Sequence, residues 1–155
     1  MKLSPNFSLN EFTFSQTAIR AGIRNEPNEE TITRLKEVAK QLEFIRNTLG
    51  ELPIRISSGY RCIALNRAIG SKDSSHHVAG YAVDFTCPTY GTPLEVASKI
   101  LAAGYKFDQL ICEGVSKANP EGAWVHISFN PMMRGEVLTM HSIGGIQTYM
   151  KGLPR

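Results

Sequence analysis

Residues 74–85, with the sequence SSHHVAGYAVDF, place an aspartate inside an otherwise apolar run. Alternation of side chains predicts a β-strand from Gly80 onward, in which successive residues point to opposite faces. Asp84 then shares its face with a glycine and an alanine, whereas Val83 and Phe85 point to the core side. This strand must therefore lie in a sheet that packs on one face and leaves Asp84 open to close approach on the other.

A second strand, predicted for residues 123–129, carries a histidine in the corresponding position. Its apolar residues alternate so that His126 points away from the core side. A lone histidine there is most often a hydrogen-bonded structural residue. Here it accompanies Asp84 and the adjacent pair His76 and His77, and three ligands drawn from histidine and aspartate are typical of a catalytic zinc site. We therefore expect a metal site.

The remaining patterns indicate an α+β protein, a single domain over residues 1–155 with a small antiparallel sheet and flanking helices. Three- and four-residue spacing of apolar residues predicts an amphipathic helix over residues 28–49. Two further expectations concern the ends of the chain: an N-terminal arm over residues 1–27, and a C-terminal tail over residues 131–155 with an edge strand. The other expected elements are strands at 53–58, 107–115 and 123–129, the last two forming an antiparallel hairpin, and helices at 62–70 and 92–104.

Composition argues against several other classes of protein. The net charge of +3 comes without a dense basic stripe, so we expect no nucleic-acid partner. The sequence has no apolar run long enough to span a membrane, and its first residues lack the apolar core of a signal peptide. We therefore expect synthesis in the cytoplasm, no membrane insertion and a monomer. Cys62, Cys87 and Cys112 form no close pair, which favours three reduced thiols.

The two histidine- and aspartate-bearing segments match a known pattern. Ser-x-His-x-x-Gly-x-Ala-x-Asp is present in residues 75–84, and WVHIS supplies a later Trp-x-His. The chain thereby resembles the zinc D-Ala-D-Ala carboxypeptidases and the related bacteriophage L-alanyl-D-glutamate endolysin peptidases. SSGYRC followed by LN, and FDQLICE, resemble further segments of the same family. The resemblance extends from about Leu3 to Phe129 and implies a hedgehog/DD-peptidase-like fold.

The resemblance also implies a ligand set. One zinc ion would be bound by His77, Asp84 and His126, with His77 rather than His76 in the ligand position. His76 is then a neighbour of the site or a solvated loop residue. His141 matches no part of the pattern, and we expect it at the surface.

For catalysis the resemblance implies hydrolysis by a zinc-activated water. We expect Glu113 to be the general base, because antiparallel pairing could bring it onto the face of His126; the alternative is a solvated residue at a strand end. The best-known branch of the family instead has Glu-x-x-His, and Ala123 occupies that glutamate position here. Arg61 is expected as the electrophilic helper, unless it is an ordinary surface arginine. Substrate-binding roles are expected for Ser75, Tyr60 and Trp124.

The resulting hypothesis is a zinc metallopeptidase that hydrolyses a peptide bond in the peptidoglycan stem, endolysin-like or D,D-carboxypeptidase-like. The resemblance further implies action at the cell wall and a phage or prophage origin. One alternative is a catalytically inactive zinc-containing module that binds the cell wall or serves in a virion. Another is a zinc-free α+β protein whose histidines are incidental.

Overall fold

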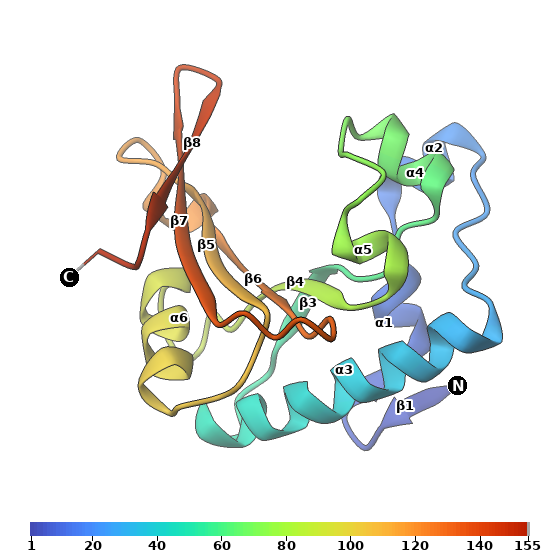
Figure 1. Cartoon of the computed structure of the whole chain (residues 1–155), viewed down its shortest axis with the longest axis horizontal. Helices are drawn as coiled ribbons and strands as arrows, with labels where there is room; N and C mark the ends of the chain where they lie inside the picture. Colours follow the sequence, from blue (N-terminus) through green and yellow to red (C-terminus); the bar gives the residue numbers. More distant parts are fainter. Residues whose placement is uncertain (155) are drawn as a thin grey trace.

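The computed structural model describes residues 1–154, and Figure 1 shows the arrangement of their helices and strands. The helices are α1 (Leu9–Thr13), α2 (Gln16–Ala21), α3 (Glu29–Thr48), α4 (Ile63–Ala68), α5 (His76–Ala79) and α6 (Pro93–Ala102), with the 3-10 turn η1 (Pro120–Gly122). The strands are β1 (Lys2–Ser4), β2 (Phe7–Ser8), β3 (Arg55–Ser58), β4 (Ala82–Thr86), β5 (Gln109–Val115), β6 (Trp124–Ser128), β7 (Glu136–Ile143) and β8 (Ile146–Lys151). The expected α+β class is confirmed.

The central sheet has the strand order β3-β4-β6-β5-β7-β8. The predicted hairpin of β5 and β6 is confirmed as an antiparallel pair. One pair departs from the expected antiparallel sheet, because β7 runs parallel to β5. The chain after β6 crosses to the far side of β5, where the amide of Glu136 donates to the carbonyl of Asp108 at 2.9 Å. Strand β7 therefore starts beside the start of β5 and runs in the same direction.

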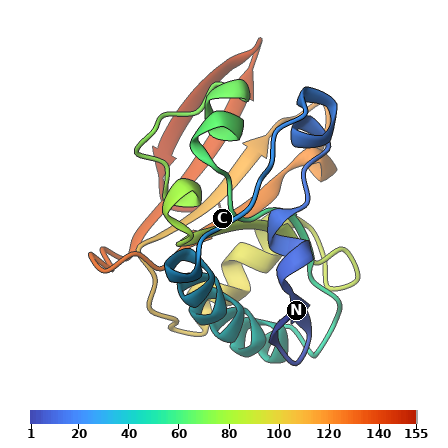
Figure 2. The same cartoon turned by 90° about the vertical axis from the view of Figure 1, so that its right-hand side faces the viewer.

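The hydrophobic core lies on one face of this sheet. Figures 1 and 2 show α3 and α6 on the same side of it. Both helices begin as their sequences predict: Asn28 caps α3 through the amide of Thr31, and Thr92 forms a capping box with Glu95 at the start of α6. The fully buried core residues include Leu35, Leu42, Ile45, Val83, Phe85, Ile100, Leu110, Val125 and Ile127. The opposite face of β4, β6 and β5 is left free for polar side chains.

The N-terminal segment is more than the arm that we expected. It forms β1, β2, α1 and α2, and the buried rings of Phe7 and Phe12 meet edge to face with centroids 6.3 Å apart. The carboxylate of Glu43 on α3 holds this segment through the backbone and side-chain amides of Asn6. These elements are too short to produce a periodic sequence signal, which explains why the sequence indicated only an arm.

The C-terminal segment likewise is not a simple tail. Strands β7 and β8 form an antiparallel hairpin, and Gly144 and Gly145 at its turn have φ angles of 57° and 81°. Positive φ at both central turn positions suits the right-handed twist of a two-residue hairpin and favours glycine. The strand expected within residues 131–155 is present as β7, but its predicted position at the edge was wrong, because β7 lies inside the sheet and β8 forms the edge.

Two local boundaries also differ from the sequence expectation. Residues 76–79 form the helical turn α5 instead of a polar loop, and Gly80 ends that turn with a φ of 80°. Strand β4 accordingly begins at Ala82 and not at Gly80. A side chain at position 80 would place its Cβ 2.8 Å from Cγ2 of Thr31 on α3, so both the φ angle and the packing require glycine there.

Candidate active site

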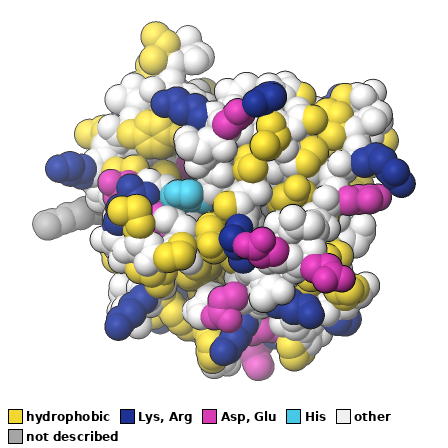
Figure 3. Space-filling model, turned by 45° about the vertical axis from the view of Figure 1, so that its right-hand side comes forward, with side chains coloured by type: hydrophobic (Ala, Val, Ile, Leu, Met, Phe, Trp, Pro, Cys, Tyr) yellow, Lys and Arg dark blue, Asp and Glu magenta, His cyan; other side chains and the backbone are white. Residues whose placement is uncertain are grey.

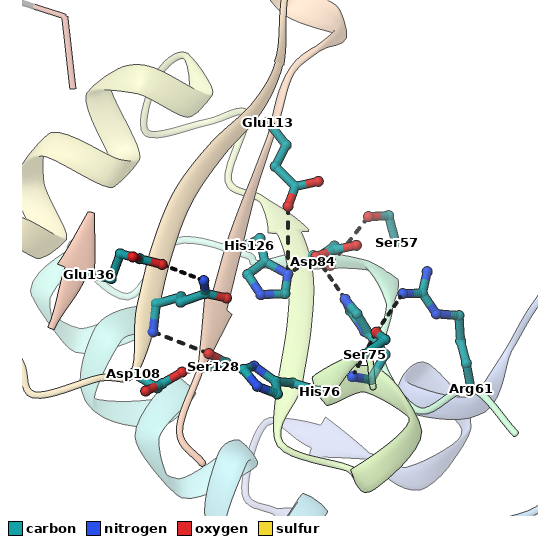
Figure 4. A network of polar contacts seen from close by, with 12 residues as sticks. Ser57, Arg61, Ser75, His76, Asp84, Asp108, Glu113, His126, Ser128 and Glu136 are labelled. Carbon is teal, nitrogen blue, oxygen red and sulfur yellow. Dashed lines mark hydrogen bonds and ion pairs between the residues drawn. The ribbon is translucent and has the colours of Figure 1, made fainter. Parts of the chain in front are cut away.

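The polar face of the sheet brings the predicted ligands together through its strand register. Asp84 on β4 is the direct cross-strand partner of His126 on β6, and on the other side of β6 His126 pairs with Ile111 on β5. Directly opposed residues of antiparallel strands share a face. The register therefore places Asp84 and His126 side by side, as Figure 4 shows.

His77 reaches the same point from α5. The hydroxyl of Ser75 caps this turn by accepting from the amide of His77. The Nδ1 atom of His77 lies 2.7 Å from the carbonyl oxygen of Gly59, which can only accept, so Nδ1 carries the proton. The lone pair of His77 Nε2 is thereby directed toward Asp84.

The three side chains form a compact, buried group. Asp84 Oδ1 lies 3.2 Å from Nε2 of His77 and 2.9 Å from Nδ1 of His126. One ligand atom from each residue lies within 4.8 Å of the others, and each of the three is less than a tenth exposed. Two imidazole nitrogens and a carboxylate oxygen are donors that zinc accepts, and three protein ligands match a catalytic site. The donor set therefore fits one zinc ion.

The electrostatics of this group favour the ionised form of Asp84. Burial raises the pKa of Asp84, but the two neighbouring imidazoles outweigh this effect and hold the pKa well below its ordinary value. Burial lowers the pKa of His126, yet the contact with Asp84 and the charge of Glu113 leave it raised. Asp84 is thus an ionised carboxylate at neutral pH, the form that binds a metal cation.

Glu113 lies at the edge of this group. Its Oε1 atom is 3.9 Å from Nδ1 of His126, and its side chain is only 16% exposed. Burial, followed by the negative charge of Asp84, raises the pKa of Glu113 despite the opposing charges of His126 and Arg61. The alternative of a solvated residue at a strand end does not describe this side chain. Ala123, at the glutamate position of the best-known branch, is buried, and Glu121 is exposed on η1.

Arg61 approaches the group from another direction, on the side of Ser75, as Figure 4 shows. One of its terminal nitrogens donates to the hydroxyl of Ser75 at 3.3 Å. Burial lowers the pKa of Arg61, while the charges of Asp84 and Glu113 act in the opposite direction. An arginine stays protonated in either case, so a cation faces the two carboxylates across the site.

A family comparison agrees with this geometry. A protein-family model described as peptidase M15 matches residues 5–128. The chain belongs to the peptidase M15 family. This family comprises zinc-dependent peptidases, among them D-Ala-D-Ala carboxypeptidase, and membership makes the chain a hydrolase of peptides. A search of the curated proteins finds no match. Within residues 1–154, no helix combines the length and apolar character needed to cross a lipid bilayer.

In this member of the family the site opens into a cleft of about 730 Å³. A histidine is visible in Figure 3 among hydrophobic, basic and acidic side chains. Ser75 and Trp124 both line this cleft. Tyr60 instead lines a neighbouring cleft of about 320 Å³, which shares Arg61 and Ile69 with the first.

The other two histidines, His76 and His141, lie outside the group formed by His77, Asp84 and His126. His76 lines the main cleft and is only partly exposed, with its Nδ1 3.9 Å from a carboxylate oxygen of Asp108, so it neighbours the site and is not a solvated loop residue. His141 is half-buried on β7, not at the surface as expected. It lies outside the group of potential metal ligands found among residues 1–154.

Sequence reasoning missed several residues that shape the site. The carbonyl of Gly59 fixes His77, and the hydroxyl of Ser57 donates to the carbonyl of Asp84 at 3.2 Å. Both precede Arg61 in a segment already singled out, but a backbone contact leaves no trace in residue types. The residues of the β7–β8 hairpin that line the cleft were also missed, because their strand was taken for part of a tail.

Proposed function

We propose that the chain is a zinc metallopeptidase that hydrolyses a peptide bond in the stem peptide of peptidoglycan. One observation carries this proposal. A largely buried carboxylate with a raised pKa, Glu113, lies beside the convergent group of His77, Asp84 and His126 on the floor of an open cleft. A zinc ligand set with an adjacent base is the arrangement that metal-assisted amide hydrolysis requires.

His77, Asp84 and His126 would hold one zinc ion. When bound, such an ion polarises the scissile carbonyl and lowers the pKa of a water molecule at the site. Glu113 is the residue placed to take the proton from that water and pass it to the leaving amine. Its raised pKa suits this transfer, because a carboxylate whose pKa lies nearer to the working pH is a stronger base and still releases the proton readily at that pH.

Arg61 is the electrophilic partner in this proposal. Its guanidinium enters the site from the side of Ser75, whose hydroxyl accepts a hydrogen bond from it. From there it can donate to the developing oxyanion or pair with a carboxylate of the substrate. The conformation of Ser75 thus affects both His77, whose amide it caps, and Arg61.

The size of the cleft and the family of the chain both favour the proposed substrate. A volume of about 730 Å³ is in the range of sites that enclose a short peptide or a comparably sized ligand. The family includes D-Ala-D-Ala carboxypeptidase, and the motifs resemble those of phage endolysin peptidases, so the stem peptide is the favoured substrate class. The proposal includes synthesis in the cytoplasm, action at the cell wall as a monomer, and a phage or prophage origin.

The experiment that tests this proposal is mass spectrometry of the products released from peptidoglycan sacculi. The protein is incubated as purified, after treatment with a chelator, and after zinc is restored. Release of defined peptides that stops with the chelator and returns with zinc supports the proposal and identifies the bond. No release from several wall types, with one zinc still bound per chain, would favour the catalytically inactive wall-binding or virion module.

A further inference from the structure

The C-terminal hairpin forms one wall of the cleft. Leu138 on β7 and Gln147 and Tyr149 on β8 line the same cleft as Glu113. The register places Leu138 beside Ile111 of β5, on the polar face of the sheet. These strands lie beyond residue 128, where the family match ends, so this wall is a feature of the chain that the family comparison does not cover.

The alternation of β8 separates its two faces. Gln147 and Tyr149 pair with Ser142 and Met140 on β7, and both line the cleft. Thr148 and Met150 point to the other face and are not among the residues that line it. Tyr149 is 53% exposed, so its ring is accessible to a molecule in the cleft. Burial, followed by the charges of Glu113 and Asp84, raises the pKa of Tyr149, which agrees with a hydroxyl near the reacting groups.

The two walls of the cleft differ in charge. Arg61 and Lys72 line it on the side of α4 and α5. The hairpin side presents an aliphatic, an amide and a phenol side chain and, among the described residues that line the cleft, no charged group. Figure 1 shows the hairpin and the α4–α5 region on opposite sides of the sheet strands that carry the ligands. A substrate chain with an anionic end and a neutral end therefore meets unlike surfaces on the two sides of the metal site.

We propose that Gln147 and Tyr149 of the hairpin bind the uncharged part of the substrate chain, with its carboxylate-bearing part directed to Arg61 and Lys72. The side-chain amide of Gln147 can donate to and accept from a neutral amide or hydroxyl group. The ring of Tyr149 offers apolar area with a hydroxyl at its end, a combination suited to both peptide and sugar. This inference rests on the proposed function. It makes Gln147 and Tyr149 residues that bind the substrate of that function.

The test measures binding and turnover separately. The chain has one tryptophan, Trp124, and it lines the cleft, so its fluorescence reports ligand binding directly. Binding is titrated in the zinc-loaded Glu113→Gln protein with two soluble probes, a stem peptide and the same peptide carrying its disaccharide. Kinetics with both probes are measured in the otherwise unaltered protein. Gln147→Ala, Tyr149→Ala and Tyr149→Phe are each made both in the Glu113→Gln protein and in the otherwise unaltered protein. The controls are Thr148→Ala and Met150→Ala, which alter the opposite face of the same strand.

We expect Gln147→Ala and Tyr149→Ala to weaken binding and raise KM about tenfold while kcat changes less than twofold, as for loss of one well-placed contact. Tyr149→Phe keeps the ring and removes the hydroxyl, so it should restore the part of the binding affinity that the ring contributes. A loss seen only with the disaccharide-bearing probe assigns the contact to sugar, and an equal loss with both probes assigns it to peptide. The inference alone is overturned if the wild type cleaves while both alanine variants behave like the controls. A wild type that neither binds nor cleaves either probe overturns the proposed function and, with it, the inference.

Discussion

Asp84 and His126 are direct cross-strand partners on β4 and β6, and their facing atoms, Oδ1 and Nδ1, lie 2.9 Å apart. This pair holds two of the three potential ligands on adjacent strands of the sheet. His77 completes the group from a single helical turn, whose position depends on the Ser75 cap and on the Gly59 carbonyl. Two of the potential ligands are thus held by sheet register and the third by local contacts.

Replacing a ligand should abolish specific zinc binding. For Asp84→Ala and His126→Ala we expect less than one-tenth of the wild-type zinc content by elemental mass spectrometry after dialysis. Zinc at about 100 times its Kd stabilises a folded protein by about 2.7 kcal/mol, so the zinc-dependent rise in Tm should also vanish. The control is His141→Ala, because His141 lies outside the group of potential ligands. This variant should keep the wild-type zinc content and the zinc-dependent rise in Tm. If the ligand variants change neither the zinc content nor the Tm of the wild type, the zinc-free alternative with incidental histidines is supported.

Removing the carboxylate of Glu113 should stop turnover without releasing zinc. Loss of a general base costs roughly 10²- to 10⁴-fold in rate, and we expect kcat of Glu113→Gln to fall in that range. Zinc content should stay at the wild-type level, because Glu113 lies outside the group of three ligands. Glu121→Gln is the matched control, since this glutamate is exposed on η1 near the alternative position of the base. Turnover at the wild-type rate in Glu113→Gln would show that Glu113 is not the general base.

Gly59 should matter for zinc affinity although it contacts His77 only through its backbone carbonyl. A Cβ at this position would lie 2.6 Å from the backbone oxygen of Phe12, so Gly59→Ala must shift the backbone whose carbonyl accepts from His77. Loss of such an orienting contact typically weakens metal affinity 10- to 100-fold, which a competition titration with a zinc-sensitive dye would measure.

The control for this change is Gly104→Ala. Gly104 has a φ of 77°, and no atom lies within 4 Å of the point that an added methyl group would occupy, so the substitution strains the backbone without a clash. It should cost about 1 kcal/mol of stability and leave zinc affinity unchanged. Equal zinc affinities in the two variants would show that the Gly59 contact does not tune the site.

The ion pair of Asp108 and Arg134 should stabilise the fold in a pH-dependent manner. Asp108 is fully buried and accepts from the backbone amide and two guanidinium nitrogens of Arg134, whose hydrogen bonds hold its pKa at about 2. Because this pKa lies below that of an unfolded aspartate, the stabilisation is complete above about pH 5 and is lost as the pH falls toward 2.

The variant Asp108→Asn tests this. Its free energy of unfolding in urea should be lower than that of the wild type by roughly 1–3 kcal/mol at pH 7, and the difference should shrink toward zero near pH 2. Asp73→Asn is the control, because the Asp73–Arg67 pair has a similar 2.7 Å contact but lies in solvent. A difference for Asp108→Asn that does not change with pH would contradict the assignment to this ion pair.

The sequence by itself determined the elements whose periodicity or capping is strong. The helix over residues 29–48 follows from apolar spacing, and the strands that carry Asp84 and His126 follow from alternation. The helix over residues 93–102 lies within its expected range of 92–104. Alternation also predicted that both side chains leave the core face, because that property depends only on neighbours in the chain. His77 was named by its motif, and the structure brings it to the same point.

Only the tertiary structure decided how close Glu113 lies to His126, because that distance depends on which strands pair and in what register. The same holds for the parallel pairing of β5 and β7, which follows from the anchoring of the crossing loop at Asp108. It also holds for Tyr149, which reaches the cleft only because the hairpin joins the sheet edge. Periodicity reports the faces of one element, whereas contacts between distant segments depend on packing and backbone hydrogen bonds that no local pattern encodes.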